Sequence, residues 1–188
     1  MTSILITAPA VEPLTIADLR AHLRVREGVE DGLLEGYLKA AREHVERCTG
    51  RALIFQSWRL YLDNWPEGRV VRLPIAPVHS VNAVTVYDAD GVARNLTSDK
   101  WTLAQGSLPP RVKISLDTGV SGLAMMGAEI EITAGYGAAP EAVPETCKQA
   151  IRLLVAHWYE NREEGAKVLS SIPQGVDRLL ASMKVPRI

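Results

Sequence analysis

Hydrophobic residues near the N-terminus recur at the three- and four-residue steps of a helix. Between residues 30 and 50, charged side chains, Arg42 among them, lie on the opposite face from a regular apolar series: Leu34, Leu38, Ala41, Val45 and Cys48. This period predicts an amphipathic helix that ends at Gly50, because glycine suits a left-handed cap. A shorter helix is expected just after Thr15, since Asp18 follows three residues later and can complete a capping box.

Beyond residue 52 the pattern changes to the alternation that is typical of strands. Five segments have this character: Trp58–Asp63, Arg69–Leu73, Val81–Tyr87, Val112–Leu116 and Glu129–Thr133. Asp88–Gly91 follows the third segment and predicts a hairpin turn. Residues 53–135 are therefore expected to form an antiparallel β unit.

Helical periodicity returns at Pro144 and is expected to continue to Glu164. The run from Cys147 to Trp158 is apolar on nearly every face, which favours the centre of a helical bundle. Pro173 begins a last short helix. The expected fold class is α+β: a small bundle of two N-terminal helices (1–52), a long core helix and a short C-terminal helix (136–182), the inserted antiparallel β unit (53–135), and a C-terminal arm (183–188).

Composition narrows the possible functions. The 188 residues fit one domain, or one core with a sizeable insertion, and 21 basic against 22 acidic side chains give a net charge of -1. Proteins that grip nucleic acid or anchor to membranes usually show a basic excess. No signal peptide or run of ~20 apolar residues is visible. Cys48 and Cys147 lack metal-type spacing and are expected to be buried free thiols, which fit a reducing cytoplasm.

No set of residues forms a recognisable catalytic or cofactor motif. Cys147 and His157 stand ten residues apart on one predicted helix, about 15 Å along its axis, so they cannot pair. Glu129 and Glu131 share one strand face at a spacing of ~6–7 Å, but alternation predicts that this face is solvated. Phosphate-binding loops and dinucleotide fingerprints are missing. We therefore predict no catalytic residue, no cofactor and no metal.

The pattern of the whole chain resembles the head-tail connector (adaptor) family of tailed double-stranded DNA phages, prophages and gene transfer agents. Four segments carry the resemblance: Pro13–Thr15 leading into Ala21–Val25, Ala40–Glu46 leading into Thr49–Leu53, Ile132–Gly137 with Val143–Glu145, and Lys148–Ile151 followed by His157–Glu163. The last segment is the most specific, because its aromatic and charged residues fall in a fixed order.

This resemblance implies a structural virion protein and no enzyme. Such a protein would form a ring of copies, commonly twelve, under the portal protein and extend the DNA channel. It would carry a tail-completion or stopper protein, and DNA would only pass through it, with no membrane involved. The particle would assemble in the cytoplasm of the bacterial host.

Two groups of residues are the candidate contact sites. By resemblance, the C-terminal arm would insert into the portal, through Met183, Lys184, Val185, Pro186, Arg187 and Ile188. Contacts between subunits would use Trp158, Tyr159 and Arg162, since large aromatic side chains anchor interfaces. The alternative is that the rings of Trp158 and Tyr159 fill the subunit's own core.

Three other functions stay open at this point. The chain could be another neck or tail-completion protein of a phage-like particle. It could be a small hydrolase whose site assembles from distant residues such as His157 and Glu141. It could also be a DNA-binding packaging regulator, although the neutral charge argues against that function.

Overall fold

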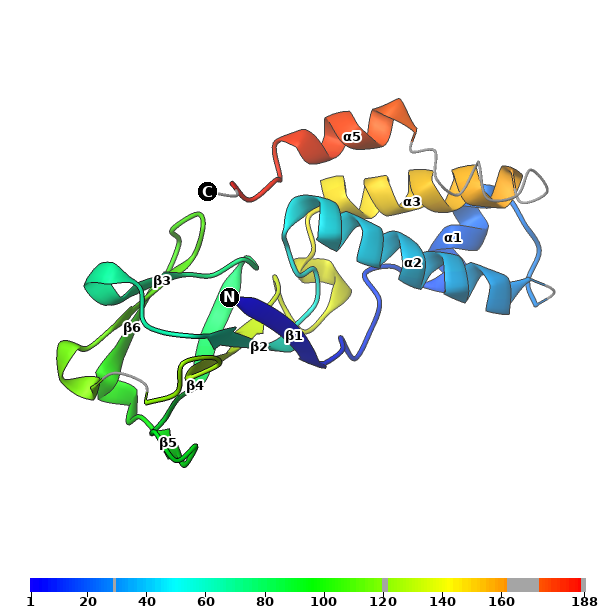
Figure 1. The fold of residues 1–188 in the computed structure, drawn as a ribbon. Coiled ribbons are helices and arrows are strands. Elements are labelled where there is room, and N and C mark those ends of the chain that lie inside the picture. The colour runs from blue at the N-terminus through cyan, green and yellow to red at the C-terminus, as the bar shows by residue number, and fades with distance from the viewer. Residues whose placement is uncertain (29, 120–121, 162–172, 187–188) are drawn as a thin grey trace. The chain divides into compact units, whose positions relative to one another are not determined.

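The computed structural model describes residues 1–28, 30–119, 122–161 and 173–186. The chain folds into two compact units (Figure 1). The helical unit consists of Val11–Ile54 and Gly137–Lys184, and the β unit consists of Met1–Ala10, Phe55–Tyr136 and the C-terminal end from Val185. Helices together with antiparallel sheets confirm the predicted α+β class.

The helical unit begins with the predicted capping box. Helix α1 (Ile16–Leu23) starts after Thr15, whose side-chain oxygen accepts a hydrogen bond from the Asp18 backbone N–H at 3.1 Å. The Asp18 carboxylate in turn accepts from the Thr15 backbone N–H at 2.9 Å. Hydrogen bonds from Thr15 hold the pKa of the Asp18 carboxyl below its ordinary value. Local sequence alone therefore fixes where this helix begins.

Helix α2 (Asp31–Thr49) matches the predicted amphipathic helix and buries its apolar face. Gly50 follows it with a positive φ of 69° and donates its N–H to the Glu46 carbonyl at 2.8 Å. A residue with a Cβ is strained in this conformation, which explains why the helix ends at glycine.

Helix α3 (Glu145–Glu160) lies among the other helices of its unit, and Figure 1 shows α2 and α5 (Gln174–Ala181) beside it. It contacts α1, α2 and α5, as the prediction of a central helix required. Its buried residues are Cys147, Lys148, Ala150, Ile151, Leu154, Val155 and Trp158. Helix α5 buries Val176 and Leu180. The predicted continuation of α3 to Glu164 lies outside the described residues.

The larger sheet of the β unit has five antiparallel strands in the order β1-β2-β8-β4-β5. The strands are β1 (Thr2–Thr7), β2 (Gln56–Leu62), β4 (Val78–Tyr87), β5 (Ala93–Asn95) and β8 (Ala128–Ala134). Leu60 and Val84 both lie opposite Ile130 in the register, and all three side chains are fully buried. The alternation of β8 is thus explained by one buried face.

A smaller antiparallel sheet has the order β3-β7-β6, with β3 (Val70–Arg72), β6 (Trp101–Ala104) and β7 (Arg111–Ile114). Its inward residues include Val71, Val112 and Ile114, which are buried. Short 3-10 helices occur at Glu67–Arg69, Ser98–Lys100, Leu116–Thr118 and Pro140–Ala142.

All five predicted strands are present, and the predicted hairpin turn joins β4 to β5. In that turn Asp88 donates its backbone N–H to the Val92 carbonyl at 3.2 Å, and Gly91 has a positive φ of 78°. Strands β1, β5 and β6 were not predicted. Every residue of β1 and β5 is exposed, so neither strand shows the alternation that a half-buried strand displays.

Arg42 is buried, although the helical period placed it on the charged outer face. Its side chain is 5% exposed and donates from Nε to Glu12 and from Nη1 to Glu46, both at 2.8 Å. The other oxygen of Glu46 accepts the Leu53 backbone N–H at 2.8 Å. Burial lowers the pKa of Arg42, but hydrogen bonds and charges from the two glutamates raise it more. The cluster joins α2 to the segments before and after it.

We predict that Arg42→Met lowers the free energy of unfolding by about 3 kcal/mol, because it leaves Glu46 with an uncompensated charge in a partly buried place. Urea denaturation measures this loss. Lys39→Met is the matched control, since Lys39 is exposed on the same helix, and it should change stability by less than about 0.5 kcal/mol. Equal effects of the two substitutions would contradict the structural role of the cluster.

Candidate assembly surfaces

The structure keeps the two residues of the hydrolase hypothesis apart. Glu141 is exposed in the 3-10 helix before α3, whereas His157 lies twelve residues after the first residue of α3, about 18 Å along its axis. The ring Nδ1 of His157 is 3.3 Å from the side-chain nitrogen of Asn161. The two residues therefore do not form a common site.

The paired carboxylates of β8 serve cross-strand contacts. Arg59 donates to Glu131 at 3.1 Å, and the Tyr87 hydroxyl donates to Glu129 at 2.7 Å. The hydrogen bond to Glu129 raises the pKa of Tyr87. The two carboxylate side chains are 15% and 29% exposed, so the face is half-buried rather than solvated as predicted. Both groups are used to hold neighbouring strands together.

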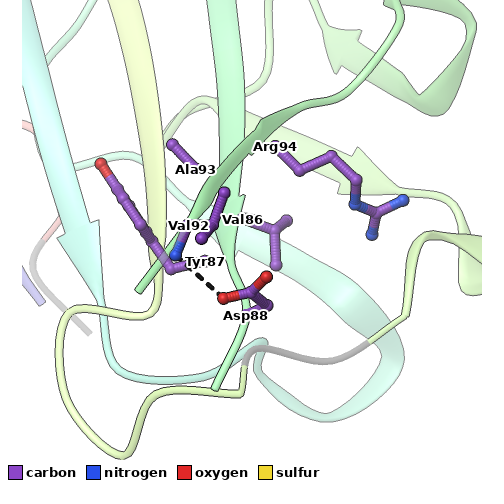
Figure 2. Close-up of a pocket in the computed structure, with 6 residues that line it drawn as sticks. All are labelled: Val86, Tyr87, Asp88, Val92, Ala93 and Arg94. Carbon is purple, nitrogen blue, oxygen red and sulfur yellow. Dashed lines mark hydrogen bonds between the residues drawn. The ribbon is translucent and has the colours of Figure 1, made fainter. Parts of the chain in front are cut away.

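A pocket lies at the β4–β5 hairpin, shown in Figure 2. Its lining residues are Val86, Tyr87, Asp88, Val92, Ala93 and Arg94. The Asp88 carboxylate accepts the Val92 backbone N–H at 2.9 Å, and Arg94 donates to the Thr118 carbonyl at 2.7 Å. The polar groups of the pocket thus stabilise the hairpin and its neighbouring loop, and they do not form a nucleophile–base pair.

The described ranges also offer neither a metal centre nor a membrane-spanning helix. Those ranges contain no group of three or more His, Cys, Asp or Glu side chains that could hold a metal ion. No helix within them combines the length and the apolar composition that a membrane span requires.

The two thiols differ in environment. Cys147 is fully buried, and this burial raises its pKa to about 11. Cys48 is half-buried, with its Sγ 3.3 Å from Nε2 of His44. The prediction of two free thiols agrees with the described structure, but only one of them is fully buried.

Of the predicted subunit contacts, Trp158 fills the interior of the helical unit. Its side chain is 7% exposed and packs near the rings of Tyr37 and His44, with centroids 6.2 and 6.5 Å away. Tyr159 is half-buried, and its hydroxyl donates to Glu30 just before α2. Arg162 lies outside the described residues. Trp158 therefore fits the core alternative, and Tyr159 keeps part of its ring accessible.

Part of the predicted C-terminal arm is held by the subunit. The Met183 carbonyl accepts a hydrogen bond from the Arg51 guanidinium, and Val185 is only 8% exposed. Lys184 and Pro186 are exposed. Arg187 and Ile188 lie outside the described residues. Along the described arm, residues that the subunit holds thus alternate with exposed residues.

Strand β1 is an exposed apolar edge that the sequence analysis missed. Ile4, Leu5 and Ile6 are 46%, 41% and 46% exposed, and the strand has no charged side chain. It pairs with β2 on one side only. Edge strands are usually protected by charges, proline or bulges. Strand β1 has an irregularity in its register between Leu5 and Thr7 but no charge and no proline, so most of its edge can still pair with another chain. This surface suits a protein that acts by contact with other proteins.

Comparison with protein families gives a match over most of the chain. The family model described as phage gp6-like head-tail connector protein matches residues 13–101 and 102–184. The chain belongs to this family. This is the family that the four resembling segments predicted. The protein is therefore a structural head-tail connector subunit.

Solved structures agree with the family. The connector is similar to a chain from the virion of a native gene transfer agent particle, with 34% identity, a TM-score of 0.83, and coverage of 100% of this chain and 97% of the other. Chains from the neck of the empty particle (35%, TM-score 0.82) and of the native particle (34%, TM-score 0.80) match with the same coverage. Comparison with functionally curated proteins gave no match.

We predict that Trp158→Ala lowers the free energy of unfolding by about 3 kcal/mol or more, because it leaves a cavity in the helical unit. Chemical denaturation monitored by circular dichroism measures the loss. Trp158→Phe keeps most of the apolar volume and should cost clearly less. A loss below about 1 kcal/mol for the alanine variant would show that the ring contributes little to the core.

A thiol-labelling experiment tests the difference between the cysteines. At pH 8 a maleimide should modify Cys48 in minutes and Cys147 only as fast as the connector unfolds, since burial keeps Cys147 protonated and covered. Mass spectrometry of labelled peptides reads out both sites. In denaturant the two rates should converge, and fast labelling of Cys147 in the native protein would contradict its burial.

Proposed function

We propose that this connector assembles with copies of itself into a closed ring beneath the portal of a phage-like particle. The observation that carries the proposal is the full-length similarity, at 34–35% identity, to chains from the neck of a gene transfer agent, which was computed with C6 and with C12 symmetry. In a cyclic ring each subunit uses two different surfaces to contact its two neighbours. The ring would lengthen the DNA channel and carry a tail-completion or stopper protein on its other side.

The surfaces described above support assembly as the main activity. Strand β1 offers unpaired backbone groups and apolar side chains along one sheet edge. Tyr159 offers a partly exposed aromatic ring of the kind that anchors interfaces. The proposed place of action is the virion, and assembly would occur in the cytoplasm of the bacterial host.

The proposed portal-binding segment is the arm from Met183 to Ile188. The Met183 carbonyl and the Val185 side chain are held by the subunit, which leaves Lys184 and Pro186 accessible within the described part of the arm. This anchoring would direct the end of the chain toward a partner and reduce the entropy lost on binding.

Electron microscopy of the purified connector mixed with the portal of its own particle tests the proposal. The expected result is a ring of connector density attached to the portal, together with a mass that increases with connector concentration. A connector that forms rings but leaves the portal bare would identify a different neck protein. A connector that stays monomeric and leaves the portal bare would overturn the proposed function.

We predict that removing residues 186–188 weakens attachment to the portal at least tenfold while the melting temperature stays within about 2 °C, because Met183 and Val185 remain in place. Sedimentation of connector–portal mixtures and thermal unfolding measure the two effects. Removing residues 183–188 should lower the melting temperature as well, since the burial of Val185 is lost. Undiminished attachment of both truncated proteins would refute the role of the arm.

A further inference from the structure

Three cations lie together on the outward face of the small sheet. Arg72 on β3 lies directly opposite Arg111 on β7, and Lys113 follows two residues later on the same face of β7. One repeat of strand alternation separates Arg111 from Lys113 by about 6.5 Å. All three residues are exposed. We call this group, Arg72, Arg111 and Lys113, the basic face.

Acidic side chains do not neutralise the basic face within the described part of the chain. The ion pairs there include none of its three cations, although half-buried Lys100 in the same unit has carboxylate partners. Like charges directly opposite each other across two strands destabilise a sheet. The fold therefore bears an electrostatic cost at Arg72 and Arg111 that an anionic partner would relieve.

The neighbouring side chains indicate which kind of anion fits. Thr102 and Ala104 of β6 lie opposite Lys113 and Arg111 and are exposed, and half-buried Val70 completes the face. This face has no aromatic residue and no large exposed apolar side chain, which a stable protein interface needs at its centre. Arginine, lysine and threonine on an open surface are the groups that usually contact DNA phosphates.

We propose that the basic face contacts the phosphate backbone of double-stranded DNA, without reading its sequence. The proposal rests on the proposed function, because the DNA in question is the duplex that a ring-forming connector surrounds. Three contacts per subunit give weak binding to an isolated subunit and stronger total binding when many copies face one duplex. The contact is electrostatic, and salt weakens it because the counterions that binding releases gain less entropy in a more concentrated solution.

The test measures binding of a fluorescent 30-base-pair duplex to the full-length connector by anisotropy at several salt concentrations. Three phosphate contacts contribute about −2.7 to the slope of log affinity against log salt, which is a loss of about 40-fold between 50 and 200 mM. In the triple variant Arg72→Gln, Arg111→Gln, Lys113→Gln this contribution should vanish. The melting temperature should stay the same or rise, because repulsion between Arg72 and Arg111 is removed.

The matched control is the triple variant Arg26→Gln, Lys39→Gln, Arg178→Gln. It removes the same three charges from exposed positions of the helical unit and should keep the slope of the unmodified connector. Equal slopes for all three proteins would overturn the proposal. So would the absence of any binding by the unmodified connector at about 20 mM salt and 200 µM protein, where non-specific contacts of this kind are measurable.

Attachment to the portal is measured in parallel on the same variants. A basic-face variant that keeps its DNA affinity but loses a protein partner would reassign the face to an acidic protein and overturn the DNA contact. A connector that binds the portal normally but shows no salt-dependent DNA binding would end this inference and leave the proposed function intact. Failure of the unmodified connector to form rings or to bind the portal would count against the proposed function instead.

Discussion

The burial of α3 is the constraint on which the helical unit depends. Seven of its sixteen residues are buried, and their three- and four-residue spacing places them on one broad face of the helix rather than all around it. A helix with so broad an apolar face is unstable in water and is stable only when other helices cover that face. Helices α1, α2 and α5 supply that cover, so segments from both ends of the sequence must come together before the unit is complete.

This requirement explains why the β unit can be inserted without disturbing the bundle. The chain leaves the helical unit after Ile54 and returns to it at Gly137. An isolated β-bridge pairs these two residues with each other. The Arg42 cluster holds the departing segment through the Leu53 N–H. With its entry and exit fixed, the bundle keeps its packing while the β unit carries exposed surfaces of its own, including β1 and the basic face.

Features set by nearby residues could be predicted from the sequence. The capping box of α1, the glycine end of α2 and the alternation of β8 each depend on a few adjacent positions. Features set by distant partners could not. Arg42 is buried because Glu12, thirty residues earlier, neutralises it. An exposed edge strand such as β1 has no buried face, so its sequence shows no alternation. The function was predicted from the resemblance to connectors, because periodicity indicates structure and not function.

Net charge is a poor guide to DNA contact in a connector, and the basic face shows why. The whole chain has a net charge of -1, which argued against a protein that grips nucleic acid. Strand pairing nevertheless brings Arg72 and Arg111, thirty-nine residues apart in sequence, directly opposite each other. In the proposed ring the contact also has to be weak, because DNA must move past it. A few phosphate contacts on each of many subunits, within a chain that is otherwise neutral, can keep a duplex centred without holding it in one place.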